Sequence, residues 1–399
     1  MNLDTAPEAN AFRAKIRAFF DNDFPKDIIA KNKSGASLTT TEVRKSEMAL
    51  GAKGWLASAW PSEHGGPGWS LEEQYIFDAE LERAGVPTVT PMGVVYVGPV
   101  IYTFGSEAQK TRWLPGIRDG SVGWAQGYSE PGSGSDLASL QFSAVREGDD
   151  YILNGTKIWT SAAQHADWIF LLTRTDNSGK KQEGISFICC ELTAPGVEVR
   201  PIITIDGKYV LSEVRFTDVR VPTDQLIGEE GKGWGYSQYL LGFERTSYAR
   251  IGGKKEMMKK VRTIAAATSM GGNQRLIDEP AFAARIAQAD INLQALEVQV
   301  LRILSALSSG GSVGNEASIV KIMATETHQQ ITELFLDAAG AYAQNKFEDS
   351  VTPNWATEAD MPVHAAPGIA SYFGGRAQSI YGGTNEIQKN IIAKRVLGL

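Results

Sequence analysis

A regular apolar repeat in the last third of the chain limits most strongly what this sequence can fold into. Its members follow one another in alternating steps of four and three residues, which places them on one face of a helix. Such a seam predicts a long helix that packs side by side with other helices in a bundle. The repeat comprises Phe282, Ile286, Ala289, Leu293, Leu296, Val300, Ile303 and Leu307.

Helical patterns also open the chain. Phe12, Ile16 and Phe19 keep the spacing of one helix face, and similar patterns recur over the next hundred residues. The further helices expected in this region cover residues 41–53, 71–84 and about 106–114.

Several residues indicate where these helices begin and end. Ser70 and Glu73 have the spacing of a capping box, and Pro115 is expected to end the helix before it. A last helix is expected to start near Thr384, while residues 345–368, with their Pro, Asn and Asp content, predict a surface loop.

Strand patterns replace the helical ones between about residues 121 and 221. Residues 141–159 predict a hairpin with a turn at Gly148 and Asp149, followed by a second turn at Asn154 and Gly155. Four more runs rich in β-branched and aromatic residues predict strands at 167–175, 185–192, 197–202 and 213–221.

The order of these patterns predicts an α+β architecture with three parts. We expect an N-terminal all-α domain at 1–120, a middle β-barrel domain at 121–232 and a C-terminal four-helix bundle at 233–399. A chain of 399 residues is long enough for two or three domains.

Composition excludes several classes of protein. The 39 basic and 46 acidic residues give a net charge of −7, which argues against a nucleic-acid binder. No run approaches the roughly 20 apolar residues of a membrane span, and the first residues lack the apolar core of a signal peptide. The two cysteines are adjacent and cannot form an ordinary bridge, so a cytoplasmic location is expected.

Common catalytic motifs are missing from the sequence. The four histidines have no metal-ligand spacing, so no metal site is expected, and neither a G-x-S-x-G elbow nor a Walker A loop occurs. The segment Gly132–Asp136 resembles a dinucleotide-binding loop but lacks its third glycine and is not followed by a helical pattern.

Three short clusters remain as candidates for a site, and each has an ordinary structural alternative. Residues 128–136 (YSEPGSGSD) offer hydroxyls and flexible backbone N–H groups, or form only a surface loop. Trp159, beside two hydroxyl residues, could face a flat ring or belong to the core. Residues 379–388 (SIYGGTNEIQ) could close onto a ligand, although a helix N-cap at Thr384 explains them equally well.

Taken together, five segments resemble the acyl-CoA dehydrogenase family of flavoproteins over almost the whole chain. The pattern is most similar to a bacterial branch that includes pimeloyl-CoA dehydrogenase large subunits. The segments are 61–68 (PSEHGGPG), 129–136 (SEPGSGSD), 154–168 (NGTKIWTSAAQHADW), 219–234 (VRVPTDQLIGEEGKGW) and 381–398 (YGGTNEIQKNIIAKRVLG).

The resemblance implies a flavin-dependent enzyme. FAD would lie between the β domain and the C-terminal bundle, with an acyl-CoA thioester over the flavin ring. The product would be a trans-2-enoyl-CoA, and the electrons would pass to an electron-transfer flavoprotein. An acyl-CoA oxidase, or a non-catalytic acyl-CoA-binding subunit of a heteromeric dehydrogenase, stays open as an alternative.

The resemblance also implies which residues form the site. Trp159 would pack against the flavin, and Ser161 would donate a hydrogen bond to the flavin nitrogen that accepts hydride. The residues implied for the cofactor are Gln126, Tyr128, Ser129, Ser135, Trp159, Thr160, Ser161, Thr384 and Glu386. Those implied for the substrate are Ser135, Gly242, Arg245, Tyr381, Gly382 and Gly383.

The catalytic base departs from the commonest family pattern. Many members carry Glu directly after the Tyr of the last motif, where this chain has Gly382. A second arrangement in the family places Glu on the first helix of the bundle, and Glu244 matches it. Glu244 is therefore the expected general base, the alternative being a surface glutamate paired with Arg245 or Arg250.

A second departure concerns the far end of the cofactor. In homomeric relatives a neighbouring subunit supplies Arg and Gln at positions that here are Glu279 and Asp290, and the segment 335–340 also differs. Two carboxylates beside a pyrophosphate repel it. A dimer or tetramer is expected, with a smaller related subunit supplying the missing cation in a heteromeric assembly.

Overall fold

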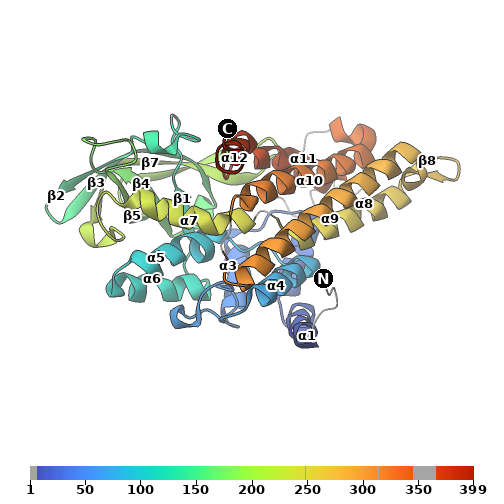
Figure 1. Cartoon of the computed structure of the whole chain (residues 1–399), viewed down its shortest axis with the longest axis horizontal. Helices are drawn as coiled ribbons and strands as arrows, with labels where there is room; N and C mark the ends of the chain where they lie inside the picture. The colour runs from blue at the N-terminus through green and yellow to red at the C-terminus, as the bar shows by residue number, and fades with distance from the viewer. Residues whose placement is uncertain (1–6, 248, 312–313, 345–364) are drawn as a thin grey trace.

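The computed structural model describes residues 7–247, 249–311, 314–344 and 365–399, with the side chains of 241–247, 344 and 365–367 outside that description. The α+β class and the predicted order of helices, β-sheet and helices are confirmed (Figure 1). The first helical group contains α1 (Pro7–Asn22), α2 (Lys26–Ser34), α3 (Thr40–Gly51), α4 (Leu71–Ala84), α5 (Gly98–Phe104) and α6 (Glu107–Asp119).

The middle of the chain forms a half-barrel sheet. Its path runs in the order β1-β4-β2-β3-β7-β6, with β5 paired beside β4. The strands are β1 (Trp124–Gly127), β2 (Ser143–Glu147), β3 (Asp150–Ser161), β4 (Trp168–Arg174), β5 (Ile185–Glu191), β6 (Val197–Ile203) and β7 (Tyr209–Pro222).

The second helical group follows the sheet. The long helices α8, α9 and α10 lie together at the opposite end of the molecule from the sheet, and α7 leads from one to the other (Figure 1). The group consists of α7 (Gly233–Ser247), α8 (Ile251–Ala267), α9 (Pro280–Ser308), α10 (Glu316–Ala339), α11 (Ala365–Gly375) and α12 (Asn385–Ile392), with a small hairpin of β8 (Ser269–Gly271) and β9 (Gln274–Arg275) after α8.

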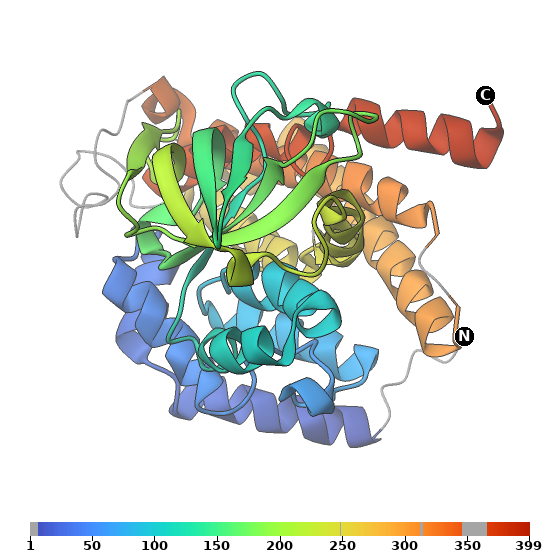
Figure 2. The ribbon, with the colours of Figure 1, turned by 90° about the vertical axis from the view of Figure 1, so that its left-hand side faces the viewer.

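The two faces of strand β4 pack into two different hydrophobic cores. Its residues are all buried, and alternate side chains point to opposite faces. Trp168, Phe170 and Leu172 pack with the first helical group, whereas Ile169 and Leu171 pack inside the half-barrel. Figure 2 shows the first helical group covering one side of the sheet.

The apolar repeat of the C-terminal bundle behaves as predicted. All its members lie on α9, and most are buried against α8 and α10. The capping box at the start of α4 is also confirmed, because Ser70 accepts from the backbone of Glu73 and Glu73 accepts from the backbone of Ser70.

The prediction that Pro115 ends its helix is wrong. α6 continues to Asp119 and stops at Gly120, which adopts φ +78°. A proline inside a helix costs about 3 kcal/mol. Leu114 and Ile117 are buried on both sides of Pro115, and their packing offsets that cost.

The predicted second turn at Asn154 and Gly155 is also wrong. β3 runs through both residues with only a shift in register against β7. The Asn154 side chain exchanges two hydrogen bonds with Asp218 of β7, at 2.9 and 3.0 Å, and so keeps the two strands together across this shift. Glycine is required at 155 because a Cβ there would lie 2.8 Å from Phe142.

The predicted surface loop at 345–368 is corrected at its end. Residues 365–368 begin α11, and residues 345–364 lie outside the described part of the chain. The predicted last helix is confirmed, with Thr384 as the N-cap of α12.

A π-helical turn over Met92–Val97 separates α4 from α5. The wider turn leaves the backbone carbonyl of Val94 without the usual helical partner, and the buried Trp60 indole donates to it at 2.6 Å. Gly98 lets the indole approach, since a Cβ at this position would lie 2.1 Å from the Trp60 ring.

Candidate active site

Trp159 lies on a distorted part of β3. The register between β3 and β7 shifts between Lys157 and Thr160, and Trp159 adopts φ +61°. Its side chain is 57% exposed, so the interpretation of Trp159 as a core residue is wrong. A positive φ in a bulky residue costs about 1–3 kcal/mol and is usually kept where a side chain must be re-aimed at a ligand.

A buried lysine ties this bulge to the neighbouring segment. Lys157 is fully buried, and its Nζ donates to the carbonyl of Tyr128 at 3.1 Å and to Oε1 of Glu130 at 2.8 Å. The backbone N–H of Ile158 donates to the carbonyl of Ser129 at 2.9 Å. Burial lowers the pKa of Lys157 to about 8, while Glu130 opposes this shift. These contacts hold Tyr128 and Ser129 beside the exposed indole.

Thr160 carries a buried hydroxyl without a hydrogen-bond partner among the described residues. Leaving such a group unpaired costs about 1–3 kcal/mol, and because Thr160 is only 1% exposed, its hydroxyl does not face the open site. Ser161 is partly exposed next to it, and Gln126 is partly exposed on β1. Ser135 is exposed in the loop after β1.

The last motif forms a tight loop before α12. Gly382 and Gly383 adopt φ +64° and +80°, which favour glycine. The Thr384 hydroxyl accepts from the backbone of Ile387 at 3.1 Å. Backbone N–H and the Thr384 hydroxyl lower the pKa of the exposed Glu386 carboxyl. Tyr381 is half-exposed at the start of this loop.

Helix α10 holds the loop at both ends. Gln329 donates to the carbonyls of Gly375 and Arg376 at 3.4 Å, and to the Ser379 hydroxyl at 3.3 Å. On the other side, Asn385 accepts from Lys321 at 3.1 Å. Hydrogen bonds to α10 therefore fix the chain on both sides of Gly382 and Gly383.

The β6–β7 hairpin brings the sheet to the C-terminal helices. A Cβ at Gly374 of α11 would lie 3.0 Å from the carboxylate of Asp206 at the hairpin tip. The backbone N–H of Ala162, just past Trp159, donates to Val210 at 3.2 Å. Ile205 and Val210 are 77% and 44% exposed, so the hairpin adds apolar surface near the exposed indole. This junction can accept a flat aromatic ligand.

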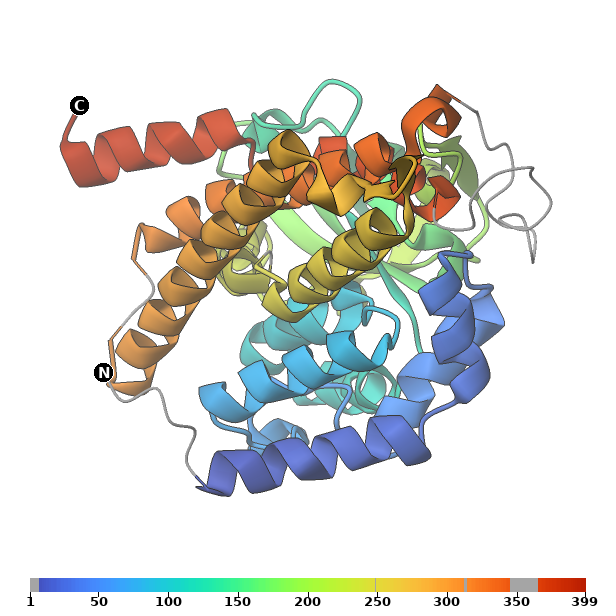
Figure 3. The ribbon, with the colours of Figure 1, turned by 90° about the vertical axis from the view of Figure 1, so that its right-hand side faces the viewer.

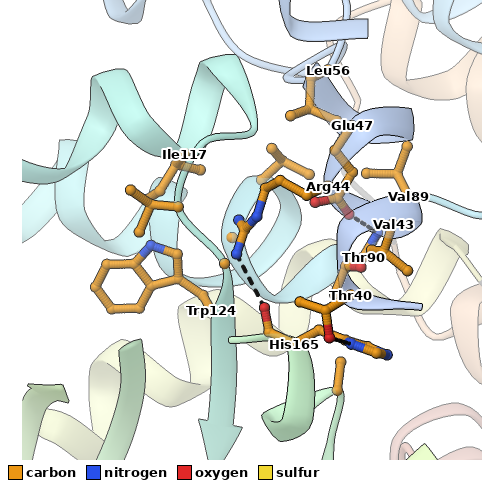
Figure 4. A pocket seen from close by; sticks show the side chains of 15 residues that line it. Thr40, Val43, Arg44, Glu47, Leu56, Val89, Thr90, Ile117, Trp124 and His165 are labelled. Carbon is orange, nitrogen blue, oxygen red and sulfur yellow. Dashed lines mark hydrogen bonds between the residues drawn. The ribbon is translucent and has the colours of Figure 1, made fainter. Parts of the chain in front are cut away.

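A small cavity supports the turn that follows Ser161 (Figure 4). Ala162 lines it in the left-handed conformation, with φ +58°. Arg44 donates to the carbonyl of His165 at 3.1 Å, and the Nδ1 atom of His165 lies 2.7 Å from the Thr40 hydroxyl. Burial raises the pKa of Glu47 on the same wall. Sequence patterns contain no signal for this cavity, because its walls come from four separate parts of the chain.

Glu244, Gly242 and Arg245 all lie on α7, and their side chains are outside the described part of the structure. The role of Glu244 therefore stays a prediction. Arg250, one of the arginines considered as its structural partner, donates to Glu82 at 2.9 Å.

The acidic residues expected at the positions of the usual FAD contacts have intramolecular partners. Glu279 caps α9 by accepting from the backbone of Phe282 at 2.5 Å. Asp290 pairs with Arg262 of α8, and in the segment 335–340 Asp337 pairs with Arg285. These carboxylates stabilise the bundle of their own chain.

Comparison with known proteins identifies the family. Residues 6–121, 125–219 and 231–397 match the N-terminal, middle and C-terminal domains of acyl-CoA dehydrogenase, respectively. Acyl-CoA dehydrogenase IpdE1 of Mycobacterium tuberculosis is 33% identical over 399 residues, which cover 98% of both chains. Acyl-CoA dehydrogenase FadE26 of the same organism is 33% identical over 408 residues, covering 100% of this chain and 99% of the relative.

Solved structures agree with this result. The chain superposes on the Tcur3481-Tcur3483 steroid ACAD with a TM-score of 0.85 and 31% identity, covering 100% of this chain and 99% of that one. The ChsE4-ChsE5 complex from Mycobacterium tuberculosis gives a TM-score of 0.85 and 32% identity, also covering 100% and 99%.

The chain belongs to the acyl-CoA dehydrogenase family. It is an oxidoreductase that acts on CH–CH bonds, and membership of this family implies FAD as the cofactor. The exposed Trp159 and the partly exposed Ser161 fit a flat ring with polar edge atoms. Across the described ranges, no helix is long and apolar enough to cross a membrane, and no three ligating side chains gather as for a metal ion.

Proposed function

We propose that this enzyme removes two hydrogens from the α and β carbons of an acyl-CoA thioester to give a trans-2-enoyl-CoA. The observation that carries the proposal is the exposed Trp159 on its strained bulge, followed two residues later by the partly exposed Ser161. The two residues present an aromatic face and a polar edge at one site, as a flavin ring requires.

The residues around Trp159 bind and orient the cofactor in this proposal. When bound, FAD supplies the acceptor for hydride and passes the electrons to an electron-transfer flavoprotein. Ser161 donates to the flavin edge, with Gln126, Tyr128 and Ser129 beside it. Ser135, Thr384 and Glu386 contact the cofactor further from the ring, and Ser135 also meets the CoA arm.

Glu244 serves as the general base that removes the α-proton. Gly382 leaves no carboxylate in the last loop, so this function falls to the helix α7 on which Glu244 lies. An apolar substrate beside the carboxylate would raise its pKa towards neutrality, where a base is most useful.

Glu244→Gln tests this role. We expect the variant to keep yellow FAD and to bind acyl-CoA, but to reduce the flavin about 10²–10⁴-fold more slowly in stopped-flow bleaching. Glu107→Gln is the matched control, because Glu107 is an exposed glutamate on α6. Unchanged bleaching in the Glu244 variant would remove it from the mechanism.

We propose a bulky, ring-containing acyl group as the substrate. One similar solved structure is a steroid ACAD, and the missing side chain at Gly382 leaves space near the α-carbon. The narrower resemblance to pimeloyl-CoA dehydrogenase large subunits stays a prediction. A series of CoA thioesters scored by flavin bleaching separates straight-chain, dicarboxylic and cyclic acyl groups.

We propose further that a second, related subunit completes the FAD site. Glu279 and Asp290 are held by their own chain and cannot supply the cation that a pyrophosphate needs. The C-terminal helix extends away from the body of the molecule in Figures 2 and 3, and Val396, Leu397 and Leu399 are exposed on its last turns. The ChsE4-ChsE5 complex shows that a similar protein assembles from two kinds of chain.

Expression of this chain alone tests the need for a companion. We expect weak FAD retention, measured as the ratio of flavin to protein after gel filtration, and recovery on co-expression with a small family member that carries the arginine. Full FAD occupancy in a homo-oligomer would refute the proposal. Rapid reoxidation in air with release of peroxide would instead indicate an oxidase.

A further inference from the structure

A buried arginine stands at the end of β4. Arg174 is 6% exposed, and burying a guanidinium is costly unless its N–H donors find acceptors. Its Nη1 donates to the carbonyl of Glu183 at 2.7 Å, and its Nη2 donates to the carbonyls of Ala138 at 2.8 Å and Lys181 at 3.0 Å. Its Nε and Nη2 also donate to the carbonyl of Leu140, at 3.4 and 3.3 Å. One side chain therefore satisfies backbone carbonyls of four residues.

These carbonyls belong to two separate segments of the chain. The first pair, at 138 and 140, follows residues 129–136, named here the Ser135 loop, and the second pair lies in the connection between β4 and β5. A guanidinium presents its donors in a fixed planar fork, so Arg174 binds carbonyls of both segments at once. Methionine, with a stem of similar length and no donor, would release both segments.

The connection between β4 and β5 returns to the Ser135 loop through an ion pair. Nζ of Lys181 lies 2.8 and 2.9 Å from the two carboxylate oxygens of Asp136. Both side chains are more than half exposed, so the pair adds little to stability by itself. Because Arg174 holds the backbone of Lys181, the pair nevertheless ties the Asp136 side chain to an anchored residue.

Hydrogen bonds inside the loop fix the chain on both sides of Ser135. The hydroxyls of Ser133 and Ser139 donate to the carbonyl of Asp136, at 2.8 and 2.7 Å. Ser133 is buried, and its backbone exchanges two hydrogen bonds with the backbone of Glu130, at 2.9 and 3.0 Å. Ser135 itself is exposed. Its hydroxyl is therefore carried by a loop whose conformation is set before a ligand binds.

The start of the same loop is attached beside the exposed Trp159. The carbonyl of Ser129 accepts from the backbone of Ile158 at 2.9 Å, one residue before Trp159 on β3. The Ser135 loop is thus anchored near the aromatic face at one end and by Arg174 at the other. An anchored loop loses little conformational freedom on binding, so it can add affinity for the part of a ligand that reaches Ser135.

We propose that Arg174 is a positioning residue for substrate binding, which through Lys181 and Asp136 holds Ser135 where its hydroxyl meets the CoA arm. The inference rests on the proposed function, which assigns this contact to Ser135, and it adds a residue that determines affinity without touching the ligand. Loss of Arg174 weakens binding of the CoA arm and raises KM. The chemical step at the acyl group, and with it kcat, stays nearly unchanged.

Two thioesters of the same acyl group test this role. One is the acyl-CoA that bleaches the wild-type flavin fastest, and the other is the matching N-acetylcysteamine thioester, which lacks the distal part of the CoA arm. With FAD in excess, we expect Arg174→Met to lower the ratio of kcat/KM for the CoA thioester to that for the short thioester about fivefold, as for the loss of one neutral hydrogen bond. The change should lie in KM for acyl-CoA, with kcat within about twofold of the wild-type value.

A double-mutant cycle with Ser135→Ala shows whether Arg174 acts through Ser135. In the Ser135→Ala background, Arg174→Met should change the ratio by less than about twofold. Arg220→Met is the matched control, because Arg220 is an exposed arginine of β7, and it should leave the ratio at its wild-type value. An additive effect in the cycle, an unchanged ratio in Arg174→Met, or an equal fall in kcat for both thioesters would overturn the proposal.

Lys181→Met decides the question if Arg174→Met does not fold, which circular dichroism will show. The Lys181 side chain is 53% exposed, so its loss leaves the core intact, and the ratio should fall about threefold. An unchanged ratio in this variant would then overturn the proposal. If neither thioester bleaches the wild type, the proposed function fails, and titration with CoA, which needs no turnover, still tests the loop. A higher Kd for CoA in the folded variant is expected, and an equal Kd would refute the role of Arg174.

Discussion

The buried ion pair beneath Trp159 allows a quantitative prediction. Lys157→Met keeps the length and apolar stem of the side chain but removes the bonds to Tyr128 and Glu130. The Glu130 carboxylate, whose side chain is 10% exposed, then keeps only its two backbone donors, Gln141 and Phe142. Breaking a buried pair in this way costs about 3–5 kcal/mol of unfolding free energy.

Urea denaturation of a double-mutant cycle measures this cost. We expect Lys157→Met and Glu130→Gln each to be strongly destabilising, and the double variant to be clearly more stable than the sum of the two predicts. If the unfolding free energy of Lys157→Met lies within about 1 kcal/mol of the wild-type value, the ion pair does not hold the bulge.

The pH dependence of the same comparison gives an independent check. The pKa of Lys157 is about 8 in the folded chain, against a normal value of 10.5. Between these values the unfolded chain holds the proton and the folded chain has released it, so rising pH favours folding. The unfolding free energy of the wild type, measured relative to that of Lys157→Met, should therefore rise by about 3 kcal/mol between pH 8 and 10.5. A constant difference over this range would contradict the shifted pKa.

Three further changes test the packing around the site. Gly98→Ala places a methyl group against Trp60 and should lower the unfolding free energy in urea by about 1–3 kcal/mol. Thr384→Ala removes the N-cap of α12 and should cost about 1 kcal/mol in the same assay. Glu82→Gln weakens the bonds to Gly253 and Arg250, so hydrogen exchange at the start of α8 should become faster while exchange in α6 stays unchanged.

Local signals were enough to predict elements that depend on one stretch of chain. Ser70 and Glu73 determine the start of α4 by themselves, and the repeat from Phe282 to Leu307 determines the buried face of α9. The errors at Pro115 and Asn154 have one cause, since the effect of each residue is decided by tertiary contacts that the local sequence does not reveal. Buried contacts of neighbouring residues continue the helix past Pro115, and Asp218 holds the strand through Asn154.

The residues of the candidate site were likewise predictable only where one stretch of chain contains them. Trp159 and Thr384 could be singled out from short motifs, because each belongs to one loop or strand. The cavity with Arg44 and the contact between Arg250 and Glu82 could not, because each joins segments more than 100 residues apart. Charged residues scattered along helices look like solvent-facing positions until the fold brings them together.

The strained backbone of Trp159 explains why the residues on both sides of it along β3 make so many hydrogen bonds. A left-handed tryptophan persists only if neighbouring contacts hold it in place, and here they lie on both sides along β3. Before it, Lys157 is anchored on Tyr128 and Glu130. After it, Ala162 forms a second left-handed position that rests on the cavity closed by Arg44. Relaxing either support would let the indole return towards an ordinary strand conformation, in which alternate side chains point to the two faces of the sheet. The aromatic face on which the flavin is proposed to lie is therefore maintained by residues that never touch it.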